Sequence, residues 1–456
     1  MRRLLRANRL RTLVALAAES LMFCAQLCAG AEPTAGVPSA LTLDLAERLM
    51  ELNNREIQSS RRAIDASAAD KIVAGQRPNP TLSFQASSVS PSQGIGAGAP
   101  WEKYIDQTVH VEQLFERGNK RELRVDQAIR NETASREDLS NSIRQQRLAV
   151  RGAYYDLLLS QDKVKLLREV ASLAEHSVAA AERRLAAGDI SKVDLARIRV
   201  DSMRVNNEAM QAEADLSRAR IVMAALIGAE SHAPAIRAID SWPAIVRQAD
   251  IAPDDLAATI EQRPDVQAAK ARAEAAESGR RLAQSQRSRD ITIGIQYEHY
   301  PVNPVFGTGN GNTYGVTVSF PLMVWHENNG EIRRSEVDRL AALDVLAKAR
   351  AIAHSEIQRA WTDLVQASER VTRYQGKLTE DAKTAAEAVE FAYQHGSIGL
   401  TDLLDARRAL RAAQLEAVTA LGEYAKAVAS WKLVLGADPA TLSSGSNLPN
   451  RKGSVK

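Results

Sequence analysis

The chain of 456 residues contains one structural pattern twice, and this duplication limits the folds that it can adopt. The segment Gly188–Leu195 returns as Gly396–Leu403, 208 positions later, and other segments recur at nearly the same spacing. A repeat of this kind indicates a duplicated structural unit. In each half the hydrophobic pattern predicts a helix, two strands, a very long helix and a further helix, in that order.

The first 31 residues have the pattern of an export signal. Five arginines precede an apolar stretch at residues 13–28, which is too short and too interrupted to span a membrane as a helix. Both cysteines, Cys24 and Cys28, lie inside this stretch, so the exported chain would have no disulfide. A lipid anchor on one cysteine is the alternative, but Phe23 and Leu27 stand where a lipoprotein signal has a small residue.

Charge and motifs exclude several classes of protein. Without the first 31 residues the chain has 54 basic and 55 acidic residues, and this balance argues against a nucleic-acid partner, which needs a clustered cationic surface. The seven histidines are scattered, without a pair at i, i+4, so the sequence predicts no metal site and no cofactor. It contains no arrangement typical of a catalytic triad or a phosphate loop, and we expect no enzyme.

The same patterns predict the boundaries of the repeats. The expected parts are an export signal at 1–31, a first repeat at 32–228 with strands at about 81–88 and 104–114, a connector at 229–250, a second repeat at 251–436 with strands at about 290–300 and 313–322, and a disordered tail at 437–456. Residues 121–187 and 331–395 are each expected to form one uninterrupted helix, of about 100 Å for the first at ~1.5 Å per residue. A seven-residue apolar rhythm in the first favours coiled-coil packing against neighbours.

The predicted strands have the pattern of membrane-facing strands. Ile291, Ile293, Ile295 and Tyr297 alternate with polar residues, and half of the 20 aromatic residues fall within residues 80–115 and 290–326. Aromatic rings favour the two lipid–water interfaces, and strands of about 9 to 11 residues match a tilted membrane crossing. Four strands are too few for a barrel, and an open edge in lipid leaves backbone groups unpaired. The expected fold class is therefore mainly α with a transmembrane β-barrel portion: three copies, a homotrimer, would close a twelve-stranded barrel in lipid, with a long helical tunnel.

Several segments carry a resemblance to a known family. They are Leu41–Ala46, Asn53–Asn54, Arg263–Val266 and Gly396–Ala406, together with Arg77–Pro80 and Glu116–Arg121. On these segments the chain resembles the TolC-like outer membrane factors, and the last two are most similar to the cobalt-zinc-cadmium resistance branch. The resemblance implies a passive trimeric exit duct in the bacterial outer membrane, with its helices in the periplasm. A periplasmic adaptor protein and an inner membrane pump of the RND type would be its partners.

Other functions stay open from the sequence. The alternatives are a periplasmic adaptor protein, the outer membrane duct of a type I secretion system, and a structural coiled-coil protein. An adaptor would have one helical hairpin between short β-domains, whereas this chain predicts two hairpins with aromatic-rich strand pairs. Metal cations, drugs or secreted proteins could all be the substrate.

The resemblance also implies site residues. The gate would consist of Asp402, Asp405, Asp194 and Tyr393, with the tyrosine bonded to Asp194 across neighbouring helices. Some relatives have a basic residue in this latch where this chain has Ile398, so either Arg407 or Arg197 would replace it or the closed state would be weaker. Alternatively, the first two aspartates are an exposed pair favoured by the helix dipole, and the tyrosine is a packing residue. The residues expected to contact the adaptor are Gly188, Asp189, Ile190, Ser191, Gly396, Ser397, Ile398 and Gly399.

Overall fold

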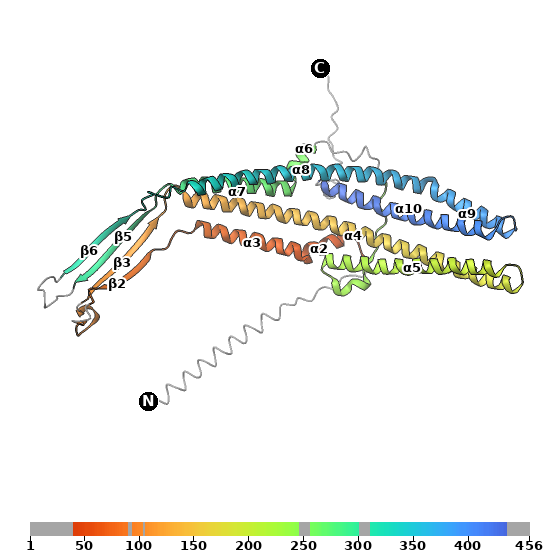
Figure 1. Cartoon of the computed structure of the whole chain (residues 1–456), viewed down its shortest axis with the longest axis horizontal. Helices are drawn as coiled ribbons and strands as arrows, with labels where there is room; N and C mark the ends of the chain where they lie inside the picture. Colours follow the sequence, from red (N-terminus) through yellow and green to blue (C-terminus); the bar gives the residue numbers. More distant parts are fainter. Residues whose placement is uncertain (1–39, 90–93, 104, 246–255, 301–310, 436–456) are drawn as a thin grey trace, which may run out of the picture.

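The computed structural model of the chain is elongated, with strands at one end and two helical hairpins at the other (Figure 1). It describes residues 40–89, 94–103, 105–245, 256–300 and 311–435. The predicted export signal at 1–31 and the predicted tail at 437–456 lie outside the described residues. So do the end of the predicted connector and the start of the predicted strand at 104.

The order of helices and strands follows the predicted duplication, and the predicted fold class is confirmed. The first repeat contains α2 (Leu43–Asn53), α3 (Arg55–Gly75), β2 (Thr81–Ser87), β3 (Asp106–Phe115), α4 (Lys120–Ala186) and α5 (Lys192–Ile227). The second repeat contains α6 (Leu256–Gln262), α7 (Pro264–Ser285), β5 (Ile291–Tyr300), β6 (Gly311–Ser319), α8 (Asn329–Arg373), the π-helical turn η4 (Tyr374–Leu378), α9 (Thr379–Gln394) and α10 (Leu400–Val434).

Three of the predicted helices are interrupted in the structure. The single helix predicted at the start of the first repeat is divided into α2 and α3 at Asn54, whose side chain caps α3 by accepting hydrogen bonds from the backbone N–H groups of Glu56 and Ile57 at 2.9 and 3.3 Å. The helix predicted at the start of the second repeat is likewise divided into α6 and α7 at Arg263. The expectation of an uninterrupted helix over 331–395 is wrong as well, because η4 separates α8 from α9. The hydroxyl of Thr379 donates to the carbonyl of Tyr374 at 2.9 Å and so satisfies one acceptor of the wide turn.

The segment that follows α5 packs against the first repeat. A 3₁₀ helix, η2 (Glu230–Ala235), leads into β4 (Arg237–Ala238), which pairs in parallel with β1 (Ala40–Leu41). The side chain of Gln161 on α4 bonds both backbone groups of Ala238, at 2.9 Å each. The described part of the predicted connector is therefore fixed to α4.

Each repeat has its own apolar core. One buried cluster joins α2, α4, α5 and the segment after α5, whereas a second joins α6, α7, α8 and α10. Buried positions on α5 recur on α10 with residue numbers that differ by 208. Such pairs are Leu195 and Leu403, Val205 and Ala413, Ala212 and Ala420, Leu216 and Tyr424, and Met223 and Trp431. The sequence repeat is therefore also a repeat of packing.

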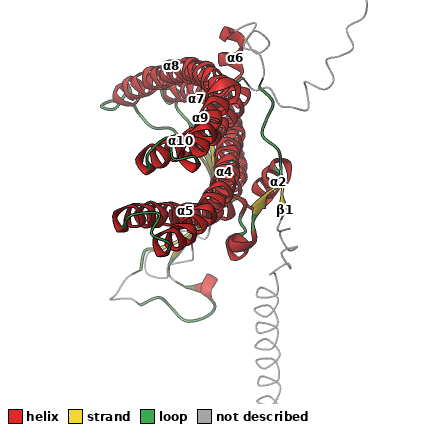
Figure 2. Cartoon of the chain, turned by 90° about the vertical axis from the view of Figure 1, so that its right-hand side faces the viewer, coloured by secondary structure: helices red, strands yellow, loops and turns green. Residues whose placement is uncertain are grey.

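The long helix α4 is central to the arrangement of helices. It contacts α3, α5, α7 and α10, which include helices of both repeats. Seen from the end, the helices form a curved layer and not a closed bundle (Figure 2). In the described part of the chain, no helix is long and apolar enough to cross a membrane.

The four long strands form one antiparallel sheet in the order β2-β3-β5-β6. The register places apolar side chains in rows on one face, and in the single chain those of the two rows below are exposed except for the half-buried Tyr297. One row is Leu82, Val111, Ile295 and Val316, and the next is Phe84, Val109, Tyr297 and Tyr314. The opposite face carries polar residues, and β2 and β6 are the two open edges.

Candidate gate and docking tip

The turns that close the two hairpins lie side by side at the end of the molecule that is opposite to the sheet (Figure 1). We call these turns, residues 187–191 and 395–399, together with the adjoining helix ends, the tip. The tip contains every site residue that the sequence predicts.

The two turns have the same geometry. Gly188 and Gly396 have φ angles of +83° and +73°, a region that glycine enters without steric cost. In the first turn Gly188 donates to the carbonyl of Leu185 at 3.0 Å and the following residue to that of Arg184 at 2.9 Å. In the second, the equivalent bonds measure 3.1 and 2.9 Å. This is the Schellman arrangement of helix ends, and it leaves the turn residues available to a partner.

Two of the predicted gate aspartates, Asp194 and Asp402, lie in the first turns of α5 and α10, and the third, Asp405, lies one turn further along α10. Asp194 accepts a hydrogen bond from the hydroxyl of Ser191 at 2.7 Å and lies 3.9 Å from Arg197. Asp402 is exposed and accepts from the backbone N–H of Gly399 at 3.3 Å, which caps α10. Both carboxylates therefore stabilise the start of their own helices in the single chain. A role in a gate would be additional to this local role.

Tyr393 contacts the other hairpin. Its hydroxyl accepts a hydrogen bond from Arg184 at 3.4 Å, and the guanidinium carbon of Arg184 lies 5.7 Å from the centre of the ring. The predicted hydrogen bond between Tyr393 and Asp194 is not among the contacts of the described single chain. It stays a prediction about the assembled protein.

Arginines of α10 connect the hairpins more directly. Arg407 bonds Glu390 of α9 at 2.7 and 3.0 Å and also donates to Ser177 of α4 at 3.1 Å. Arg408 bonds the buried Asp201 of α5 at 3.0 Å and also lies 3.2 Å from Asp405. Three neighbouring helices are thus tied to α10 by two successive residues.

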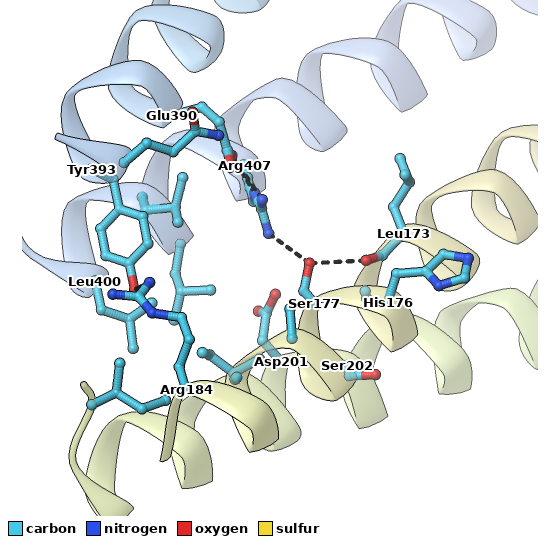
Figure 3. A pocket seen from close by; sticks show the side chains of 18 residues that line it. Leu173, His176, Ser177, Arg184, Asp201, Ser202, Glu390, Tyr393, Leu400 and Arg407 are labelled. Atoms are coloured by element: carbon cyan, nitrogen blue, oxygen red, sulfur yellow. Dashed lines mark hydrogen bonds and ion pairs between the residues drawn. The ribbon is translucent and has the colours of Figure 1, made fainter. Parts of the chain in front are cut away.

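Between these contacts the tip is incompletely packed. A cavity of about 360 Å³ lies between the hairpins, with Arg184, Ser177 and Asp201 on one side and Tyr393 and Arg407 on the other (Figure 3). A second cavity of about 550 Å³ adjoins it and shares several lining residues. The only apolar cluster found among the described tip residues is small, with Leu400, Leu403 and Leu404 buried at its centre. Polar bonds therefore carry much of the contact between the hairpins.

Sequence reasoning found the turns but missed part of this seam. Either Arg407 or Arg197 was expected to replace the missing basic residue at Ile398. In the structure Arg407 reaches Glu390 and Ser177, and Arg197 donates to Thr401 at 3.4 Å. The contributions of Arg408 and Asp201 were not predicted. The spacing of charged residues on α5 and α10 was the available signal, but it does not specify which faces of the two helices contact each other.

Comparisons with known proteins agree with this architecture. The sequence profile of the outer membrane efflux protein family matches residues 48–229 and 256–437. The chain is 24% identical, over 87% of its length and 90% of the relative's, to the cobalt-zinc-cadmium resistance protein CzcC of Cupriavidus metallidurans. Its structure is similar to that of CusC, with a TM-score of 0.73, 16% identity and coverage of 89% of this chain and 95% of the other. The structure of VceC from Vibrio cholerae gives a TM-score of 0.71, 19% identity and coverage of 86% and 96%.

Two successive hairpins above an open four-stranded sheet define the chain as a protein of the efflux channel type. With both repeats matched by the profile, the chain belongs to the outer membrane efflux protein family. The resemblance to TolC-like outer membrane factors is thereby confirmed.

Proposed function

We propose that the chain is the outer membrane channel of a tripartite efflux system and that its cargo is divalent transition-metal cations. Three copies would complete the sheet as a barrel, and the helices would form a tunnel that a periplasmic adaptor meets at the tip. The inner membrane pump, of the RND type, would supply the energy. In this arrangement Asp194, Asp402, Asp405 and Tyr393 contribute the gate, and the turn residues contribute the adaptor contacts.

The observation that carries the proposal is the apolar face of the sheet. Leu82, Phe84 and Val316 are 70%, 65% and 74% exposed, and they lie in continuous cross-strand rows. An apolar patch of this kind marks an interaction surface or contact with lipid. Unpaired strand edges are costly in lipid, so the edges β2 and β6 would have to pair with those of neighbouring copies. Three copies would give about twelve strands, which is enough for a closed barrel.

The other face of the sheet supports a cationic cargo. Its acidic residues are Asp106, Glu112 and Glu298, and the four described strands contain no lysine or arginine. A pore that is lined by carboxylates favours cations. The similarity to CzcC supports metal resistance in particular, because that relative is named for resistance to cobalt, zinc and cadmium.

Two alternatives are less well supported. The periplasmic adaptor is disfavoured because the profile of a different family covers both repeats. A type I secretion duct would use the same fold, and only the cargo would distinguish it.

Deleting the gene in its native bacterium tests the cargo. We expect tolerance to Co²⁺, Zn²⁺ and Cd²⁺ to fall and to return on complementation, while tolerance to ethidium and the secreted proteins stay unchanged. Loss of ethidium tolerance or of a secreted protein, with metal tolerance intact, would contradict the metal cargo.

Fractionation tests the channel. The protein should be recovered in the outer membrane as a trimer that resists dissociation in detergent until it is heated. Recovery as a monomer in the periplasmic fraction would contradict the proposed channel.

A further inference from the structure

The duplication separates the features of the tip that both hairpins share from those that one hairpin alone has. Arg407 and Glu390 on the second hairpin correspond, 208 positions earlier, to Arg199 and Glu182 on the first. These residues also form an ion pair, and both pairs measure 2.7 Å. This pair within a hairpin is therefore a general feature of the repeated unit.

Arg408 has no such counterpart. The corresponding residue of the first hairpin is Val200, which is 54% exposed. Arg408 does not stay within its own hairpin, because its Nε donates to Asp201 of α5 at 3.0 Å. The side chain of Asp201 is only 10% exposed, so this carboxylate depends on Arg408 for charge compensation.

Arg408 also changes the charge of the predicted gate. Its Nη1 lies 3.2 Å from Oδ1 of Asp405, one helical turn away. Asp402 instead accepts from a backbone N–H at the start of α10. Both carboxylates are exposed, Asp405 to 64%. The two predicted gate carboxylates therefore differ, since one is compensated by an arginine and the other is open to a cation.

We propose that Arg408 is a positioning residue with two effects: it couples the hairpins in the closed tip, and it compensates the charge of Asp405 so that Asp402 is the uncompensated carboxylate of the gate. The proposal rests on the proposed channel function. Closure of the tip depends on the bond between Arg408 and Asp201, whereas the charge of the gate depends on the contact between Arg408 and Asp405. Mutation can therefore separate the two effects.

The experiment uses full-length trimers in planar lipid bilayers. Single-channel conductance in KCl reports closure, and block by hexaamminecobalt(III), an inert trivalent cation, reports the charge of the gate. In Arg408→Gln we expect a higher conductance together with block that is about fivefold tighter, because a carboxylate loses its nearby positive charge. In Asp201→Asn we expect only the higher conductance, since Arg408 still compensates Asp405.

The matched control is Arg199→Gln. It also removes one positive charge from the tip, but it breaks a pair within the first hairpin and leaves the seam to α10 intact. The proposal is overturned if Arg408→Gln gives the same conductance and the same block as Arg199→Gln. If Arg408→Gln has a higher conductance than the wild type but is blocked equally, then Arg408 does not compensate the charge of Asp405.

If Arg408→Gln does not assemble, Arg408→Lys still tests the proposal. Arg408→Lys keeps a positive charge near Asp405 but cannot hold two carboxylates with one rigid fork, so it should behave as Asp201→Asn. Wild-type protein that forms no channel at all would refute the proposed function itself. Channels in which Arg408→Gln matches Arg199→Gln would refute only the role of Arg408.

Discussion

The phenol oxygen of Tyr154 lies 2.8 Å from Oδ2 of Asp240, and the backbone N–H of Asp240 donates to the same phenol oxygen at 3.2 Å. The phenol also lies 3.0 Å from the carbonyl of Leu41, and Asp240 accepts from the backbone N–H of Leu43 at 2.7 Å. Tyr154 on α4 therefore joins the start of the first repeat to the segment that follows it. Burial raises the pKa of this phenol, so it stays a donor.

Removal of this hydroxyl should loosen the junction. For Tyr154→Phe we expect the free energy of unfolding to fall by about 1–3 kcal/mol, because the polar groups of Leu41 and Asp240 lose the phenol as a hydrogen-bond partner. Thermal unfolding monitored by circular dichroism measures the loss. Tyr155→Phe is the control, since the ring of Tyr155 stacks on Trp242 with centroids 6.3 Å apart and the substitution keeps that contact. Equal stability of Tyr154→Phe and the wild type would contradict the prediction.

The orientation of the sheet gives a second prediction. Val316 lies in an apolar row, whereas the next residue, Thr317, lies on the polar face opposite Gly294. If the apolar face contacts lipid, Val316→Lys introduces a charge there, at a cost of about 2–4 kcal/mol per chain near the midplane. We expect few heat-resistant trimers from Val316→Lys and near-normal amounts from Thr317→Lys. Greater damage from Thr317→Lys would reverse the assigned orientation.

Local chemistry and periodicity made much of the fold predictable from sequence. The apolar alternation in Ile291–Tyr297 depends only on neighbouring residues, and so does the need for glycine at positions 188 and 396. The cap of α2 is equally local, since the hydroxyl of Thr42 accepts from the backbone N–H of Leu45 at 3.3 Å.

Contacts between distant segments were not predictable in this way. Asn54, at the break between α2 and α3, donates to the carbonyl of Leu226 at 3.0 Å, 172 positions away, and the pair of Arg408 and Asp201 joins residues 207 positions apart. These contacts depend on how the helices cross, which a single sequence does not specify. The tip turns were therefore found from the sequence, whereas the part of the polar seam formed by Arg408 and Asp201 was not.

Acid should weaken the contact between α7 and α8. Hydrogen bonds from Arg280, opposed by burial and reinforced by Arg281, lower the pKa of Glu277 from 4.5 to about 2. A carboxyl group with a lowered pKa in the folded state stabilises the fold above its ordinary pKa, and this stabilisation is lost as the pH falls towards 2. Arg339 of α8 lies 3.9 Å from the same carboxylate, so the loss affects both helices.

Thermal melts at several pH values test this dependence. Glu277→Gln should have a lower melting temperature than the wild type at pH 5, and the difference should shrink between pH 4.5 and pH 2. Glu369→Gln is the control, because its pair with Arg373, at 3.4 Å, is exposed and contributes little. A difference between Glu277→Gln and the wild type that does not change with pH would contradict the assignment.

The π-helical turn predicts that one deletion is tolerated where another is not. Its hydrogen bonds span one residue more than those of an α-helix, so the turn contains one residue beyond the regular repeat. Deletion of Gly376 should convert it into an α-helical turn and leave the direction of the α9 side chains nearly unchanged. Deletion of Ala385, within regular α-helix, should instead rotate the residues that follow by about 100°. That rotation would separate Glu390 from Arg407, which are 2.7 Å apart.

We therefore expect the Gly376 deletion to keep the closed, low-conductance channel, and the Ala385 deletion to give fewer trimers or a leaky channel. Equal damage from both deletions would show that the extra residue of the turn is needed for the packing of α9 on α10.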